Sequence, residues 1–221
     1  MDMTVARARL LVPVFLLVGA VLGVLGPVLT RPRPDGGREV AGGALGQVVH
    51  LLARAGWSWA AFAFAVGWVC RSWRRAVWLA PAALTVAVTA YYLVKMAQGE
   101  FRAFDMTVGY YEQPDPLPID WAGFLSKAVA WWVAAVTFGP LLGWAGTLAR
   151  RPHLSGLAFR LLVPLIAIVD MTVRLPGSRE LDGAVAIDTW STVRIAAAVT
   201  CALLTVWALH TTLRARRVVR T

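Results

Sequence analysis

Four acidic residues, Glu100, Asp105, Glu112 and Asp170, lie in strongly aromatic or apolar sequence. The first three alternate with aromatic residues between positions 100 and 112, and Asp170 directly follows an apolar run at residues 165–169. A carboxylic acid kept neutral by burial can protonate an alkene or an epoxide, and a dry aromatic pocket stabilises the carbocation that results. The four acids are therefore the candidate catalytic residues for a reaction of this kind.

Aromatic residues that could form the walls of such a pocket occur near the same acids. Lys95, Lys127 and Arg194 each lie within helical reach of one of these rings, and such pairs can share a helix face. The same pattern is also typical of a membrane interface, where Trp and Tyr form a belt beside snorkelling Lys and Arg. The candidate substrate-binding residues are Tyr91, Tyr92, Phe104, Tyr110, Trp121, Trp131 and Trp190.

Asp170 has two interpretations. It lies about 21 Å along a helix from Gly156, at about 1.5 Å per residue, and this depth places it within the bilayer. A carboxylate there must be paired or protonated, and Arg174, one turn later, is a suitable partner. Asp120 and Asp188 differ, because each stands just before an expected membrane helix and is better suited to N-capping than to catalysis.

The sequence lacks the usual signatures of metal and nucleotide chemistry. It contains no Gly-rich phosphate loop, no His-Glu-x-x-His motif and no paired Asp-rich boxes of the kind that bind magnesium and diphosphate. Its two cysteines and three histidines lie in separate segments without metal-binding spacing. We therefore expect neither a metal site nor a cofactor.

The composition places these residues in a membrane protein. Hydrophobic residues make up 58% of the chain, and the mean hydropathy of +0.63 leaves too little polar surface for a soluble domain. The chain has six apolar runs, most of which approach the roughly 20 residues that cross a bilayer; the second reaches this length only with Arg54, and the fifth only with Arg160 and Asp170. The sequence predicts one all-α membrane domain, a polytopic bundle, with helices at about 8–30, 47–70, 75–96, 121–148, 156–173 and 189–212. A re-entrant fifth run is the alternative.

The distribution of charge predicts the orientation of the bundle. Apart from Asp2, the acidic residues all fall on one side, and most of the basic clusters fall on the other. The positive-inside rule then predicts cytoplasmic termini and a multi-pass protein of a bacterial cytoplasmic membrane. Anionic membrane lipids account for the net charge of +10 without a nucleic-acid partner. The basic residues assigned to the cytoplasmic side are Arg7, Arg9, Arg71, Arg74, Arg75, Arg150, Arg151, Arg214, Arg216, Arg217 and Arg220.

In size, polytopic layout, aromatic richness and isolated acids, the chain resembles the small integral-membrane terpene cyclases of bacterial indole and diketopiperazine terpenoid pathways, the drimentine-type enzymes. The resemblance implies a metal-free cyclase that acts on a neutral prenylated compound. Asp170 or Asp105 would protonate the terminal alkene, and Glu100 or Glu112 would accept a proton at the end. The Ala, Arg, Val and Leu bias resembles that of a high-GC bacterial genome.

A non-enzymatic membrane protein is the competing interpretation. In a small carrier, immunity factor or assembly subunit, the same acids would serve as helix caps and ion pairs. A transporter would be expected to have two related halves with broken helices in matching positions, and the sequence has no such symmetry. The sequence gives no indication of the oligomeric state.

Overall fold

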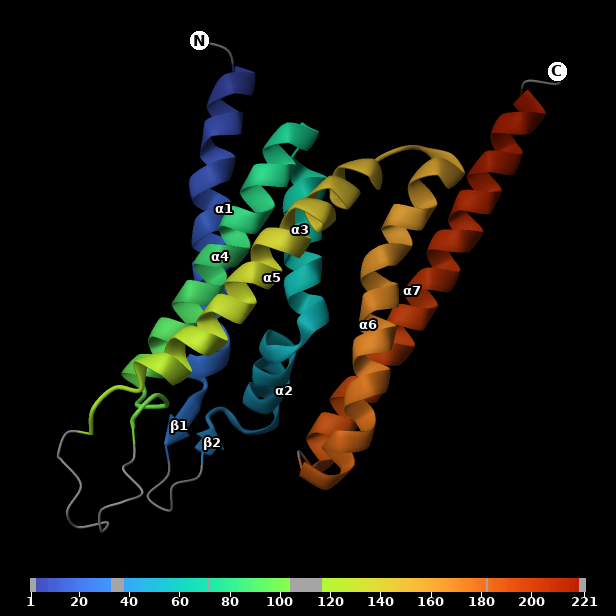
Figure 1. Ribbon diagram of the computed structural model, residues 1–221. Coiled ribbons are helices and arrows are strands. Elements are labelled where there is room, and N and C mark those ends of the chain that lie inside the picture. The colour runs from blue at the N-terminus through green and yellow to red at the C-terminus, as the bar shows by residue number, and fades with distance from the viewer. Residues whose placement is uncertain (1–2, 33–37, 71, 104–116, 182, 219–221) are drawn as a thin grey trace.

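The computed structural model is a bundle of helices (Figure 1). It describes residues 3–32, 38–70, 72–103, 117–181 and 183–218. Two short strands, β1 (Thr30–Pro32) and β2 (Arg38–Val40), form an antiparallel hairpin after the first helix. The helices are α1 (Met3–Val28), α2 (Gly43–Arg54), α3 (Gly56–Val69), α4 (Trp73–Ala97), α5 (Trp121–Leu148), α6 (His153–Leu181) and α7 (Gly183–Val218). The predicted all-α polytopic bundle is confirmed.

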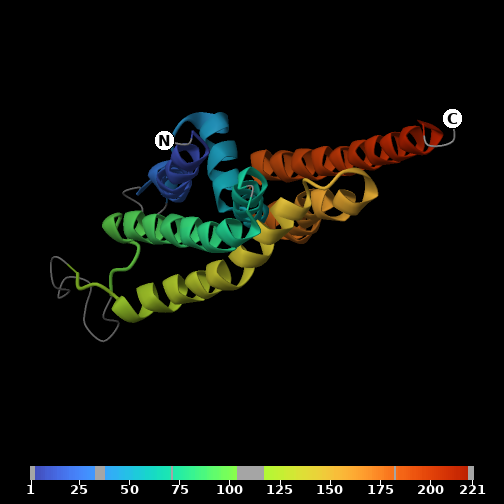
Figure 2. The same ribbon diagram turned by 90° about the horizontal axis from the view of Figure 1, so that it is seen from above.

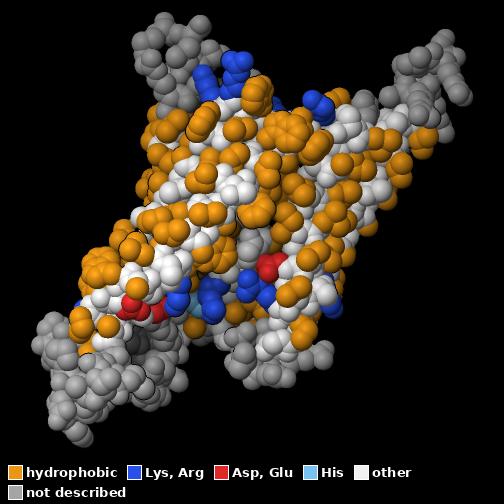
Figure 3. All heavy atoms as spheres, in the orientation of Figure 1, with side chains coloured by type: hydrophobic (Ala, Val, Ile, Leu, Met, Phe, Trp, Pro, Cys, Tyr) orange, Lys and Arg blue, Asp and Glu red, His pale blue; other side chains and the backbone are white. Residues whose placement is uncertain are grey.

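The helices have the length and composition of membrane spans. Five of them are long and apolar enough to cross a bilayer, and the bent pair α2 and α3 can supply a sixth crossing. Both chain ends lie at the same end of the bundle (Figure 1). On the face drawn in Figure 3, hydrophobic side chains cover the middle, Lys and Arg lie at the upper end, and mixed charges form a lower band. This is the surface expected of an integral membrane protein.

The expected second helix, 47–70, is not continuous. It divides at Ala55, whose extended backbone (φ −73°, ψ 135°) ends α2 and begins α3 with a bend of 67°. Neither a proline nor a capping side chain at Ala55 marks the break, so local sequence signals miss it. The freed backbone groups find partners elsewhere in the fold, as described below.

The two expected capping residues differ in outcome. Asp120 is the N-cap of α5, where its carboxylate accepts a hydrogen bond from the backbone N–H of Gly123 at 2.8 Å. Asp188 is not a cap, because α7 already begins at Gly183 and Asp188 lies exposed more than a turn inside it. The helix starts early at a glycine with positive φ (77°), which turns the chain tightly out of α6.

Small residues allow the helices to pack closely. Gly19 and Gly23 of α1 face the backbone carbonyls of Ala83 and Ala87 on α4, and a Cβ atom at either glycine would collide with these carbonyls. This is the small-xxx-small contact that the spacing of these two glycines predicts. Gly139 makes a comparable contact from α5 to α4.

The helices form two groups. Helix α4 packs against α1 and α5, and α3 packs against α4 and α5. Helices α6 and α7 form a long hairpin beside this group (Figures 1 and 2), which it contacts chiefly through α2 and α3. The bent α2–α3 segment thus joins the two groups and contributes to the candidate site.

Candidate functional site

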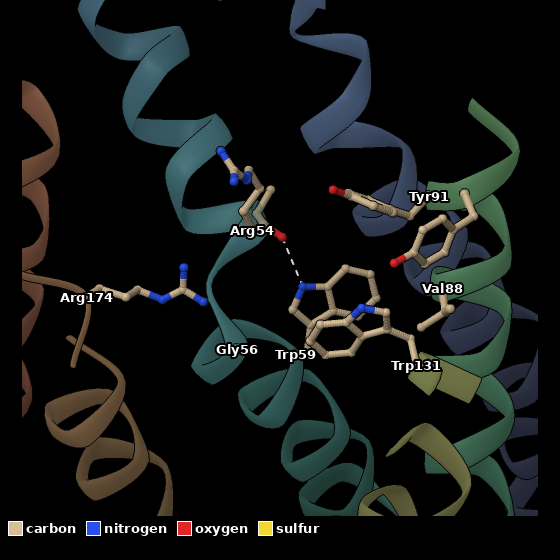
Figure 4. Close-up of a pocket in the computed structure, with 9 residues that line it drawn as sticks. Arg54, Gly56, Trp59, Val88, Tyr91, Trp131 and Arg174 are labelled. Carbon is tan, nitrogen blue, oxygen red and sulfur yellow. Dashed lines mark hydrogen bonds between the residues drawn. The ribbon is translucent and has the colours of Figure 1, made fainter. Parts of the chain in front are cut away.

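A cavity of about 260 Å³ lies at the bend between α2 and α3. Side chains from α2, α3, α4, α5 and α6 converge on it, so no single segment defines it. In Figure 4, Arg54 and Arg174 lie on one side of the cavity, and Tyr91 and Trp131 on the other. We call it the polar cavity; its lining is Ala53, Arg54, Gly56, Trp59, Val88, Tyr91, Tyr92, Trp131 and Arg174.

The break at Ala55 is held by hydrogen bonds that also orient the cavity walls. The indole Nε1–H of Trp59 donates to the carbonyl of Ala53 at 3.0 Å, shown dashed in Figure 4, and so satisfies an acceptor at the end of α2. The backbone N–H of Trp57, in the first turn of α3, donates to Oδ2 of Asp170 at 3.1 Å. A carboxylate from α6 therefore caps α3, where both the free donors and the helix dipole favour negative charge.

Asp170 also forms the ion pair that its spacing permits. Nε of Arg174 donates to Oδ1 of Asp170 at 2.8 Å, and the Arg174 guanidinium lies 5.8 Å from the ring centre of Trp190. Of the two interpretations left open by the sequence, the structure has the paired carboxylate. Both described hydrogen bonds to Asp170 come from N–H donors, one on each carboxylate oxygen.

A second ion pair lies at the end of α4. Gly99 adopts positive φ (76°), and the N–H groups of Gly99 and Glu100 return to the carbonyls of Met96 and Lys95 as in a Schellman motif. This turn brings the Glu100 carboxylate to 2.6 Å from Nζ of Lys95. Lys95 in turn lies 5.1 Å from the ring centre of Tyr91, so the pair borders the aromatic wall of the cavity.

An apolar groove of about 420 Å³ continues from the polar cavity. The two spaces share Gly56, Trp59, Val88 and Trp131, so they are contiguous. The groove lies between α5 and α6 over a floor of α3 and α4, and its rim residues Phe138 and Leu141 are both 57% exposed. The remaining lining consists of Ala60, Leu84, Ala134, Ala135, Leu142, Leu162 and Ile166.

The structure brings together some of the candidate residues and separates others. Tyr91, Tyr92 and Trp131 line the polar cavity. Trp190 instead lies behind Arg174, almost fully buried in the cluster between α2, α6 and α7, and Trp121 is 55% exposed at the start of α5. Lys127 lies over Phe101 rather than reaching Trp131 for a cation–π contact among the described residues. The candidate residues Phe104, Asp105, Tyr110 and Glu112 lie outside the described part of the chain.

Sequence reasoning missed Trp59 and Arg54. Trp59 belongs to an apolar run without a charge nearby, and nothing local distinguishes its ring from three other Trp side chains of α3 and its flanks. Arg54 directly precedes an apolar run, where a charged residue commonly marks the end of a span. Its proximity to Arg174 follows from the bend, which the sequence does not predict.

No arrangement for a metal was found in the described part of the chain, where no three His, Cys, Asp or Glu side chains lie close enough to hold an ion. Comparison with known protein families, with curated proteins and with solved structures gives no match.

Proposed function

We propose that this membrane protein binds an amphipathic small molecule, with its apolar chain in the groove and its polar end in the polar cavity. The observation that carries the proposal is the continuity of the two spaces through Gly56, Trp59, Val88 and Trp131. Charged and hydroxyl-bearing side chains line one end, and the other end is almost entirely hydrocarbon. The volume of the groove falls within the range of about 300 to 1,000 Å³ that is usual for small-molecule sites.

The position of the groove supports access from the bilayer. Its rim consists of side chains on the lipid-facing surface of α5, so an apolar chain can enter laterally without crossing water. The rings of Trp59 and Trp131 lie where the groove meets the polar cavity, and amphipathic indoles suit such a boundary.

Photolabelling tests the proposal. A farnesyl probe that carries a diazirine should label residues of α5 and α6 in the purified protein. Ala134→Trp should reduce labelling at least about tenfold, because a bulky ring would fill the groove at a lining position. Val133→Trp is the matched control, since Val133 is the neighbouring residue and is 59% exposed. Equal labelling of both variants, or none in the unmodified protein, would contradict the proposal.

Cyclisation of a prenyl chain is a second candidate function, which requires the reverse orientation, with the terminal alkene in the polar cavity, and one observation favours it. Trp59, Tyr91, Tyr92 and Trp131 place four aromatic rings around the polar cavity, and such rings can stabilise a carbocation. In this reaction, protonation of the terminal alkene leaves a tertiary cation, the internal alkene closes the ring with its π electrons, and loss of a proton restores neutrality. The product therefore has the mass of the substrate.

The proton donor for this reaction would be one of the four candidate acids. Asp170 adjoins the cavity beside Gly56, but it could act as the acid only after its ion pair with Arg174 opens and the carboxylate takes up a proton from solvent. Glu100 is paired with Lys95 in the same way. Asp105 and Glu112 are the other two candidate acids.

Turnover separates the cyclase from a non-enzymatic carrier, immunity or assembly protein. Membranes that contain the protein should convert a farnesylated indole or diketopiperazine, without added magnesium, to an isomer of equal mass and shifted retention time. Asp170→Asn and Asp105→Asn, compared at equal expression, should identify the proton donor by a loss of at least about 100-fold. Probe binding without turnover across a panel of prenylated compounds would leave the binding proposal and remove the cyclase.

A further inference from the structure

We propose that the polar end of the ligand is an anion, a carboxylate or a phosphate, held between Arg54 and Arg174. This inference rests on the proposed binding of an amphipathic molecule and adds the charge of its head group. It identifies a ligand class different from the neutral prenylated compound that the family resemblance implies.

Positive and negative charges are unequal at the polar cavity. Arg54 and Arg174 are the cationic side chains in its lining, and the lining contains no acidic residue. Asp170, at the edge of the cavity beside Gly56, offsets the charge of Arg174, and Glu100 offsets that of Lys95. Arg54 is exposed at the last position of α2, and within the described chain no carboxylate lies in ion-pair range of it. The cavity therefore has an excess of positive charge.

Arg174 retains donors for a ligand. Its bond to Asp170 uses Nε, and the other contact recorded for it within the described residues is the face of Trp190. A guanidinium carries five N–H donors, so those on the terminal nitrogens can still reach an oxyanion. Figure 4 shows the Arg174 guanidinium directed toward Gly56 and the cavity. Asp170 and Trp190 contact the same side chain and fix its position.

The groove explains why the anion should carry an apolar chain. Because the cations lie at one end of a continuous space and the hydrocarbon lining at the other, a single orientation satisfies both parts of an anionic amphiphile. A neutral head group would leave the Arg54 charge without a counter-ion beside a low-dielectric space. A carboxylate or phosphate would instead form charge-assisted, bidentate hydrogen bonds with guanidinium groups.

Competition among probes of equal chain length tests the inference. Palmitate, hexadecyl phosphate and hexadecanol should each displace the farnesyl diazirine probe from the full-length protein in uncharged detergent at pH 8. We expect the two anions to compete at concentrations at least about tenfold lower than the alcohol. Their ranking distinguishes a carboxylate site from a phosphate site, and inorganic phosphate alone should not compete because it lacks the chain.

Substitutions locate the selectivity. Arg54→Gln should bring the anions to the level of the alcohol, whereas Lys127→Gln, which removes an exposed cation outside both spaces, should leave the preference unchanged. Arg174→Lys retains a charge for Asp170 but removes the planar donor fork, so it should weaken the anions more than the alcohol. Because Arg54 has no described structural bond, a failure to fold is not expected to obscure its result.

The outcomes separate the inference from the proposed function. Equal competition by all three probes would overturn the anionic head group and leave the binding proposal intact. Competition by none of them, with no labelling by the farnesyl probe, would remove the binding proposal itself. An anion preference that survives both Arg54→Gln and Arg174→Lys would also overturn the inference, since the selectivity would then come from other cations.

Discussion

At the scale of single residues, Asp170 connects three parts of the fold. Its two oxygens accept hydrogen bonds from α3 and from Arg174, and Arg174 in turn packs on Trp190 of α7. A residue in this position stabilises the structure whatever else it does. Loss of activity in an Asp170 variant is therefore informative only beside a measurement of stability.

Asp170→Ala should lower the free energy of unfolding by about 3 kcal/mol, because it leaves the Trp57 N–H and the Arg174 guanidinium without their acceptor. Asp170→Asn should cost less, since an amide oxygen can still accept from Trp57. Thermal unfolding in detergent measures both, with Asp188→Ala, an exposed carboxylate of α7, as the control. An Asp170→Ala protein as stable as the Asp188→Ala protein would rule out this bridging role.

At the scale of elements, the bend between α2 and α3 creates the junction of the two spaces. Gly56 lines both the polar cavity and the apolar groove, and a Cβ atom there would lie 3.4 Å from Oδ2 of Asp170. Gly56→Ala should therefore fold and bind nearly normally, because this distance is an ordinary contact. Gly56→Leu should block the junction and reduce photolabelling by at least about tenfold. Full labelling of the leucine variant would show that the ligand does not pass this point.

The close contact between α1 and α4 should contribute to the stability of the protein. Gly23→Ala should destabilise the protein by about 2 kcal/mol, because its methyl group would collide with the Ala87 carbonyl and force the helices apart. Gly177→Ala is the matched control within α6, since nothing lies near its Cβ position and alanine favours helix by up to about 1 kcal/mol. Unfolding midpoints of the two variants should move in opposite directions. If the unfolding midpoints of both variants moved in the same direction, close packing at Gly23 would be contradicted.

At the scale of the whole molecule, both chain ends and the α5–α6 connection lie at one end of the bundle, and the bend between α2 and α3 lies away from that end (Figure 1). Residues on both sides of this bend line the polar cavity. The positive-inside rule predicts that the basic clusters lie in the cytoplasm, and this orientation would place the cavity nearer the outer leaflet. In a background without Cys70 and Cys201, Gly177→Cys should react with an impermeant maleimide in intact cells. Ser155→Cys, exposed near the start of α6, should react only after permeabilisation. The reverse pattern would invert the orientation and place the cavity near the cytoplasm.

The sequence by itself determined the membrane helices, the shared side of the chain ends, the Asp120 cap and the pairing distance between Asp170 and Arg174. Each of these depends on composition or on spacing within one helix, and such local properties persist whatever the helices pack against. Only the tertiary structure decided the break at Ala55, the inclusion of Trp59 and Arg54 in the polar cavity, and the exclusion of Trp190 from it. These features depend on the rotation and register of separate helices, which are set by close contacts such as Gly23 against Ala87 and by the carboxylate that α6 supplies to α3. No pattern along a single segment contains that information.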